Sequence, residues 1–331
     1  MPKGMPVELS ITCQEAIKKW GNAISLAFFD QACQIFTVEG IEGIIGYRTE
    51  NNCVVVFGDP VCPDHNLSIL LSEFHTFCKN FTDNIIYIAA SQNFVKNKAF
   101  EHHGAFIGMG DEIILNPQRD LLKETGTYSS ALRQKYRNAL GAHLEVLEYR
   151  GSDSKLEEEL NHVLKSWLEN RRGPQIYLFN INIFNYSQNR RWFYARHEGQ
   201  TIGLLMINRM DKYAGWALNG ALITIPDAPK STSEMMVLSV LEVLKNEGCN
   251  FFTIGATPGI EINKTQGFSN FKKSLLKLAF WISQKFFKLS ERQRYWKKFK
   301  PDKRSMFLIF FNPKVGLKET LAIMKAMNVR F

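Results

Sequence analysis

Two side chains in the second half of the chain could serve a reaction that needs a donor for an oxyanion and a base for a hydroxyl. Asn219 follows an apolar strand and precedes Gly220, so its amide could orient a carbonyl or donate to an oxyanion. Glu234 lies in the first turn of an expected helix and could serve as the base. Each has an ordinary alternative, because a strand-end Asn can cap its own turn and an acid near a helix N-terminus often balances the helix dipole.

A second set of residues suits contact with a substrate. Gly255 and Thr257 follow a strand in a run of small residues that would let a ligand approach the backbone, although a simple strand-to-helix turn has the same composition. Arg171 and Arg172 form a guanidinium pair suited to phosphate or carboxylate, although loop arginines are often only solvated.

The histidines and cysteines have no spacing typical of a catalytic or metal site. The six cysteines are scattered without a Cys-x-x-Cys pair, and no Ser/His/Asp or Cys/His arrangement can be argued from spacing. We therefore expect no metal, no structural zinc and a reducing compartment.

The surplus positive charge of the chain lies in one segment, 268–304. Twelve lysines and arginines there stand against two acids, a net of +10, whereas the whole chain carries +9. Nine aromatic residues are interleaved with these cations. The segment therefore predicts an anionic partner, either a lipid surface or a nucleic acid.

The first part of this segment, 268–290, has the pattern of a basic amphipathic helix. Apolar residues recur at steps of three and four, and the opposite side carries cations and one tryptophan. An interfacial helix places lysines at lipid phosphates and an indole at headgroup depth, whereas a helix packed on its own core would only solvate them. The residues expected to bind a membrane or another anion are Lys272, Lys273, Lys277, Trp281, Lys285 and Lys288.

The elements that must position these residues alternate between strand and helix. A hairpin at 44–57, a helix at 67–81 and strands at 85–89 and 111–115 are expected in the first half. A basic helix at 129–140 is expected to be capped by Gly141. The second half repeats the alternation, with strands at 192–196, 202–208, 213–218, 250–254 and 306–311 and helices at 156–170, 233–246 and 318–327. This alternation predicts an α/β (α+β) fold with mixed sheets flanked by helices.

Length and composition predict two soluble domains. The 331 residues exceed what one core usually serves, and we place a boundary near the small polar run 151–154, giving domains 1–150 and 151–331. The start of the chain lacks a signal-peptide pattern, and no apolar run approaches the ~20 residues that span a bilayer.

Several motifs occur in an order that resembles the catalytic domain of the bacterial phosphatidylglycerol lysyltransferase (aminoacyl-phosphatidylglycerol synthase) family. The resemblance covers 43–311. It rests on Phe57-Gly58-Asp59-Pro60, Gly108-Met109-Gly110-Asp111-Glu112, Leu132-Arg133-Gln134-Lys135-Tyr136-Arg137-Asn138, Pro226-Asp227-Ala228-Pro229, Ile254-Gly255-Ala256-Thr257-Pro258 and Tyr295-Trp296-Lys297-Lys298-Phe299-Lys300-Pro301.

The resemblance implies two tandem acyltransferase domains of the GNAT type that move an amino acid from aminoacyl-tRNA to a lipid hydroxyl. It implies aminoacyl-tRNA as co-substrate, no cofactor, an anionic phospholipid surface and tRNA as partners, and a cytoplasmic, peripherally membrane-bound chain without the family's transmembrane flippase. The active cleft would lie between Leu218-Asn219 and the 254–259 loop. Lys298, in the position of a family Lys-Phe-x-Pro motif, would then be catalytic, and Arg304 would bind substrate.

Two departures from the family pattern keep other functions open. An Asp-x-x-Arg pair expected before the Pro-Asp-Ala-Pro motif is replaced by Gly220 and Ile223, and a Trp-Glu-Pro-Arg motif by 303–306. One alternative is a catalytically lapsed member that only binds anionic membrane or RNA. Another is a GNAT enzyme that uses acyl-CoA to acylate a small amine or protein, although its nucleotide-binding signature is not clean in this sequence.

Overall fold

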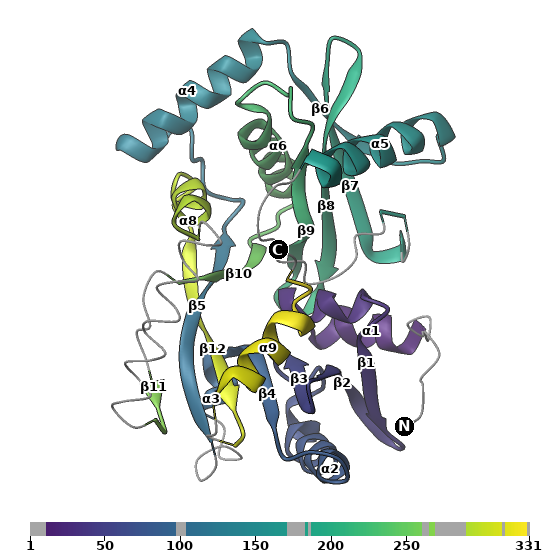
Figure 1. Ribbon diagram of the computed structural model, residues 1–331. Coiled ribbons are helices and arrows are strands. Elements are labelled where there is room, and N and C mark those ends of the chain that lie inside the picture. The colour runs from purple at the N-terminus through teal and green to yellow at the C-terminus, as the bar shows by residue number, and fades with distance from the viewer. Residues whose placement is uncertain are drawn as a thin grey trace.

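A computed structural model describes residues 11–96, 104–170, 183–184, 187–259, 265–268, 289–312 and 315–329 (Figure 1). Its strands join into one mixed sheet that runs through both halves of the chain. Their order in the sheet is β1 (Gln34–Val38), β2 (Ile41–Glu50), β3 (Cys53–Phe57), β4 (Ile85–Ser91), β12 (Asp302–Phe310), β5 (Ala105–Leu115), β10 (Phe252–Pro258), β9 (Gly215–Thr224), β8 (Gln200–Met210), β7 (Arg190–His197) and β6 (Glu145–Tyr149), with β11 (Thr265–Gln266) paired to β5. The expected class, a mixed α/β fold flanked by helices, is confirmed.

The first half is a sheet covered by a helix on each face. Alternate residues of β3 and β4 point to opposite sides, so Val54 and Val56 pack against α2 (Leu67–Lys79) while Val55 and Phe57 face the side of α9 (Leu317–Ala326). The expected hairpin is confirmed as the antiparallel pair β2 and β3.

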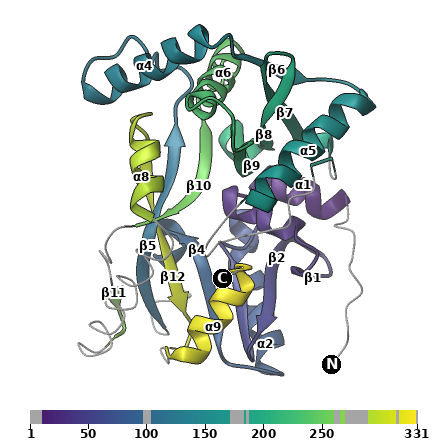
Figure 2. The ribbon, with the colours of Figure 1, turned by 45° about the horizontal axis from the view of Figure 1, so that its top comes forward.

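The second half follows the same plan. α5 (Ser154–Asn170) covers one face of β8 and β9, while α6 (Thr232–Asn246) and α4 (Thr127–Gly141) lie on the other (Figure 2). Residues alternate accordingly along β8, where Leu204 and Met206 face α5 and Leu205 and Ile207 face α6. Gly203 is needed here because a Cβ would lie 2.8 Å from the Met236 sulfur.

Three segments tie the halves together. β12, from near the C-terminus, pairs with β4 on one side and β5 on the other. The 3-10 helix η1 (Ala23–Phe29) contacts β2 and β3 as well as β9 and β10. The first helix, α1 (Ile11–Trp20), packs against β8 and against η5 (Asp211–Tyr213). The division into domains at residue 150 stays a prediction, and a hydrogen-bonded sheet crosses it.

Two expected local features are wrong. Gly141 is the last residue of α4 and has no positive φ, whereas His143 takes the left-handed conformation at φ 51°. The basic segment was expected to be helical only over 268–290, whereas the helix α8 (Leu289–Lys297) continues beyond that range. The remaining short elements are η2 (Asp64–Asn66), α3 (Gln92–Val95) and η4 (Ser187–Asn189).

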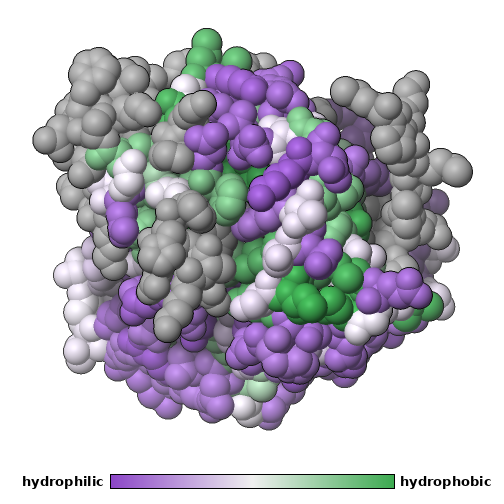
Figure 3. All heavy atoms as spheres, turned by 90° about the horizontal axis from the view of Figure 1, so that it is seen from below, coloured by the Kyte–Doolittle hydropathy of each residue, from purple (hydrophilic) through white to green (hydrophobic). Residues whose placement is uncertain are grey.

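The surface is mixed in polarity. Seen from below, most of the described surface is hydrophilic, and a group of hydrophobic side chains lies near its middle (Figure 3). α2, at the bottom of Figure 1, carries exposed Ile69 and Phe77, and the exposed Phe81 follows it. In the part of the chain that the structure describes, no helix is both long and apolar enough to cross a membrane.

Candidate functional site

The strands that contain Asn219 and Gly255, β9 and β10, are paired over only a short stretch. β9 and β10 pair in parallel at Trp216–Phe252 and Ala217–Thr253, and their recorded pairing ends there. β10 continues along β5 after a bulge between Thr253 and Gly255, while β9 continues along β8. Gly255 has a φ of +80°, a conformation that side-chain-bearing residues rarely adopt. Among the described residues, β9 and β10 therefore pair at only two positions.

The secondary structure at Asn219 and at the 254–259 segment differs from the prediction. Asn219 was expected at the end of a strand but lies inside β9, two residues beyond Ala217, because β9 runs on to Thr224. Its side chain is outside the described part of the structure. The 254–259 segment, expected as a loop, is strand as far as Pro258.

The structure brings together Glu234 and Lys298, two of the expected catalytic residues. Lys298 Nζ forms an ion pair with Glu234 Oε1, and the Glu234 and Lys298 side chains are only 4% and 18% exposed. Ser233 Oγ donates to the other carboxylate oxygen at 3.0 Å. The ammonium also lies 4.2 Å from the centre of the Tyr295 ring. Glu234 lies in α6, which packs on β9. Lys298 directly follows α8, and α8 packs on β10.

Thr257 presents an unused hydroxyl. It is 2% exposed, and its Oγ1 has no hydrogen-bond partner among the described residues. Thr257 is the register partner of Asp111 in β5, whose carboxylate lies 3.6 Å from Lys303 Nζ. Since register partners share a face of the sheet, these three side chains lie on the same face of the β12–β5–β10 segment.

The opposite face of these strands carries Arg304 and a carboxyl that the sequence analysis missed. Glu112 is the register partner of Arg304 and is 5% exposed. The Arg304 guanidinium lies 5.3 Å and 5.4 Å from the ring centres of Tyr213 and Phe251, which stack on each other at 4.5 Å. An exposed guanidinium held on an aromatic surface is suited to phosphate or carboxylate. Glu112 ends the Gly-Met-Gly-Asp-Glu motif, so its signal was a charged residue leading directly into an apolar strand.

One acid of the first half, Asp59, also interacts with Glu112. Asp59, which follows β3, accepts the backbone N–H of Ser91 at 2.8 Å. Burial raises the pKa of the Asp59 carboxyl, against the opposing effect of Ser91 and Lys212. Asp59, Glu112, Lys212 and Arg304 thus interact electrostatically although they come from four separate elements.

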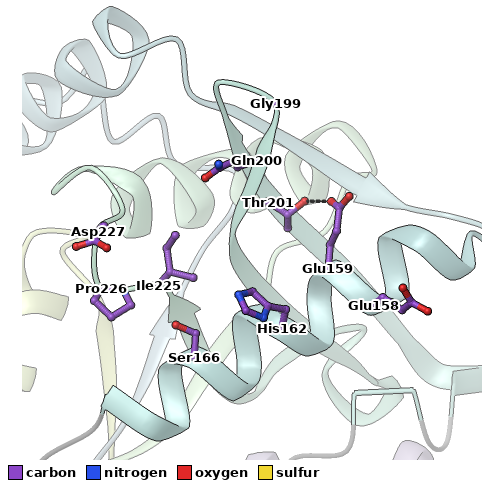
Figure 4. Close-up of a pocket in the computed structure, with 10 residues that line it drawn as sticks. All are labelled: Glu158, Glu159, His162, Ser166, Gly199, Gln200, Thr201, Ile225, Pro226 and Asp227. Carbon is purple, nitrogen blue, oxygen red and sulfur yellow. Dashed lines mark hydrogen bonds between the residues drawn. The ribbon is translucent and has the colours of Figure 1, made fainter.

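A cavity of about 630 Å³ opens on the other side of the second half, beside α5 (Figure 4). Three carboxylates, those of Glu158, Glu159 and Asp227, are among its lining residues. Thr201 Oγ1 donates to Glu159 at 2.6 Å. These carboxylates would repel a phosphate, so Arg304 is better suited than this cavity to bind an anionic group.

The remaining expected residues fall where the structure gives no description. These are Arg171 and Arg172, which were expected to bind substrate, and six residues that were expected to bind a membrane or another anion, namely Lys272, Lys273, Lys277, Trp281, Lys285 and Lys288. Among the residues that are described, no group of three or more His, Cys, Asp or Glu side chains could hold a metal ion.

Ile223, one of the two departures from the family pattern, lies in the core. It is fully buried among Leu160, Leu204 and Met206 beneath α5. This position of β9 therefore contributes to packing and presents no charged group to a ligand.

Comparison with known proteins gives consistent matches along most of the chain. The sequence profile of a family described as "Phosphatidylglycerol lysyltransferase, C-terminal" matches residues 19–310. A phosphatidylglycerol lysyltransferase of Staphylococcus aureus (strain MRSA252) is 24% identical over 309 residues, which cover 90% of this chain and 35% of the relative. The chain thus spans about a third of the length of that relative.

Solved structures share the fold. L-PGS from Bacillus licheniformis superimposes with a TM-score of 0.77 at 17% identity, covering 99% of this chain and 100% of that one. The C-terminal DUF2156 domain of an Agrobacterium fabrum protein gives a TM-score of 0.73 at 17% identity, covering 92% and 91%.

Proposed function

Because the chain belongs to the phosphatidylglycerol lysyltransferase C-terminal family, we propose that it transfers an aminoacyl group from aminoacyl-tRNA to the hydroxyl of an anionic phospholipid such as phosphatidylglycerol. The observation that carries this proposal is the separation of β9 from β10 beside the buried Glu234–Lys298 pair. A cleft between diverging strands can hold the reacting ester next to groups that are already charged and fixed.

The reaction exchanges one ester for another. The acceptor hydroxyl oxygen bonds to the aminoacyl carbonyl carbon, the bond from that carbon to the terminal ribose oxygen of the tRNA breaks, and the hydroxyl proton ends on the ribose oxygen. The tetrahedral intermediate carries its negative charge on the former carbonyl oxygen. The protein must therefore stabilise that oxygen and move one proton.

We assign these tasks to the expected residues. Lys298 supplies positive charge toward the oxyanion, and Asn219 supplies a second donor from β9. Glu234 accepts the hydroxyl proton while the adjacent ammonium balances the change in charge. Gly255 and Thr257 would line the cleft from β10, where the buried Thr257 hydroxyl has no hydrogen-bond partner among the described residues. Arg304 holds the anionic phosphate of the acceptor.

The membrane contact in this proposal comes from the basic segment. Lys272, Lys273, Lys277, Lys285 and Lys288 would bind anionic lipid headgroups, with Trp281 at headgroup depth. Arg171 and Arg172 would bind the phosphates of the tRNA end. The chain would then work at the inner face of the membrane, with no cofactor beyond its two substrates.

Buried Ile223 favours one second candidate, a member that binds membrane or RNA without turnover. An apolar side chain in the core cannot replace the charged residue expected there. This candidate predicts salt-sensitive binding to anionic vesicles with no product.

The test incubates the purified chain with tRNA carrying a labelled amino acid and with vesicles that contain phosphatidylglycerol. We expect label in the extracted lipid, and none when the vesicles contain only neutral lipid. Vesicle binding without labelled lipid, for any amino acid, would establish the binding candidate instead. Stabilisation by acyl-CoA but not by aminoacyl-tRNA analogues would point to the acyl-CoA alternative.

A further inference from the structure

Glu112 is a buried acid that none of the roles above uses. It lies in β5 and is 5% exposed, and Thr253 in β10 beside it is fully buried. Thr253 Oγ1 lies 3.0 Å from Glu112 Oε1 and 3.0 Å from the carbonyl oxygen of Ile113. The same hydroxyl oxygen accepts the backbone N–H of Gly255 at 3.0 Å.

The number of protons that the Thr253 hydroxyl can donate indicates which protonation state of Glu112 fits these hydrogen bonds best. A threonine hydroxyl has one proton to donate and can accept two. If Glu112 is ionised, that single proton is shared between the carboxylate and the Ile113 carbonyl. If Glu112 is protonated, its O–H donates to Thr253, the Thr253 proton goes to Ile113, and every group is satisfied. With the neutral acid, the single Thr253 proton does not have to be shared between two acceptors.

The charges around Glu112 come from three other elements. Burial raises the pKa of Glu112, and Asp59 after β3 acts in the same direction. The contact with the Thr253 hydroxyl, Arg304 of β12 and Lys212 of η5 act in the opposite direction, and the net effect is a raised pKa. Tyr213 of η5 also faces this group, and its own pKa is raised to about 12, so it stays neutral.

Thr253 connects this acid to the candidate cleft. It is the last residue of β10 that pairs with β9, and the register shift along β5 begins immediately after it. Its hydroxyl holds the N–H of Gly255 in the left-handed conformation that makes the bulge. The bulge lies where the pairing of β10 with β9 ends, and a bulge bends the strand that carries it.

We propose that Glu112 is a positioning residue, held as a neutral acid whose proton is donated to Thr253, and that this bond fixes the Gly255 bulge and with it the separation of β9 and β10. The inference rests on the proposed function only in so far as the separated strands form the transfer cleft. The state of Glu112 and the rigidity of the bulge can both be measured without any activity.

The structural test compares Glu112→Gln, whose amide can still donate to Thr253, with Glu112→Ala, which cannot, and takes the exposed Glu145→Gln as the control. Carbon-13 NMR of the Glu112 carboxyl is expected to show that it keeps its proton to a higher pH than an accessible glutamate does. The Gly255 amide should exchange with solvent about tenfold faster in Glu112→Ala and Thr253→Val than in wild type, Glu112→Gln and Thr253→Ser. A Glu112 that loses its proton at the pH of an accessible glutamate, or equal exchange in Glu112→Gln and Glu112→Ala, would overturn the proposal.

The activity test uses the pH profile of transfer. Wild type should lose rate as the pH rises through the raised value of Glu112, whereas Glu112→Gln should not, since its amide does not titrate. A merely structural acid would give the two proteins the same profile, which would also overturn the proposal. Absence of transfer in wild type would refute the proposed function alone, because the NMR and exchange results would stand.

Discussion

Glu234 at the start of α6 and Lys298 just after α8, 64 positions apart in the chain, form an ion pair that is almost closed to solvent. The pair links the elements that pack on the two strands bordering the candidate cleft. A buried pair in such a place affects both stability and reactivity, and the two effects can be separated by experiment.

Replacing Lys298 by Met should destabilise the fold because it leaves the Glu234 carboxylate buried without its partner. We expect a loss of about 3 kcal/mol in the free energy of unfolding, measured by urea denaturation. Replacing both residues by Met should recover most of that loss. The matched control is Lys165→Met, which breaks the exposed pair with Glu169 and should cost less than about 1 kcal/mol. Equal costs for Lys298→Met and Lys165→Met would contradict a structural role for the buried pair.

His75 should make stability depend on pH in the mildly acidic range. Burial, with a smaller effect of Lys79, lowers the pKa of His75 from 6.5 to about 4. The unfolded chain therefore takes up the proton first as the pH falls, so stability is lost between about pH 6.5 and 4, by up to about 3 kcal/mol. His75→Gln should flatten this part of the stability profile, whereas His65→Gln at an exposed position should not. Identical profiles for His75→Gln and wild type would show that the imidazole is accessible to protons.

Arg304 should act on substrate binding more than on the chemical step. Its guanidinium lies on the rings of Tyr213 and Phe251, and among the described residues it forms no ion pair with an acid. Arg304→Lys keeps the charge but loses the planar contact, so we expect KM for lipid to rise about tenfold with kcat little changed. A selective fall in kcat would instead place Arg304 at the reacting atoms.

The lysines of the basic segment should control attachment to lipid. Replacing Lys272, Lys277 and Lys285 by Glu reverses three charges, and each cation near an anionic surface contributes about 1 kcal/mol. Sedimentation with phosphatidylglycerol vesicles should then show loss of binding, and wild-type binding should weaken as salt rises. Binding by the triple variant equal to that of wild type would place the membrane contact elsewhere.

Local patterns in the sequence predicted much of the fold. The apolar spacing at 67–81 predicted α2, and the apolar runs on each side of Asn51-Asn52 predicted the β2–β3 hairpin, because these signals lie within a few residues of each other. The end of β9 was placed too early because the sheet partner that extends the strand, β8, is not a local signal. His143 took the left-handed position expected at a glycine because the chain turns there after α4 rather than at Gly141.

The candidate site was predicted in part. Residue type and motif led to the prediction of Asn219, Glu234, Lys298, Gly255 and Thr257, and their roles stay predictions. Only the fold could show that Glu234 and Lys298 form an ion pair. Glu112 was missed because its partner Thr253 lies 141 positions away, and its burial depends on strands from both halves. Such long-range pairings leave no periodic signal.

The central claim is that the cleft between β9 and β10 transfers an aminoacyl group to lipid. The most direct measurement is a single-turnover assay in which excess protein, labelled aminoacyl-tRNA and phosphatidylglycerol vesicles are mixed and the label in the lipid phase is followed with time. Wild type should transfer label to lipid, and Lys298→Met, assayed at a temperature where it is folded, should be slower by about 100-fold or more. Folded wild-type protein that leaves all label on the tRNA, whichever amino acid it carries, would contradict the account.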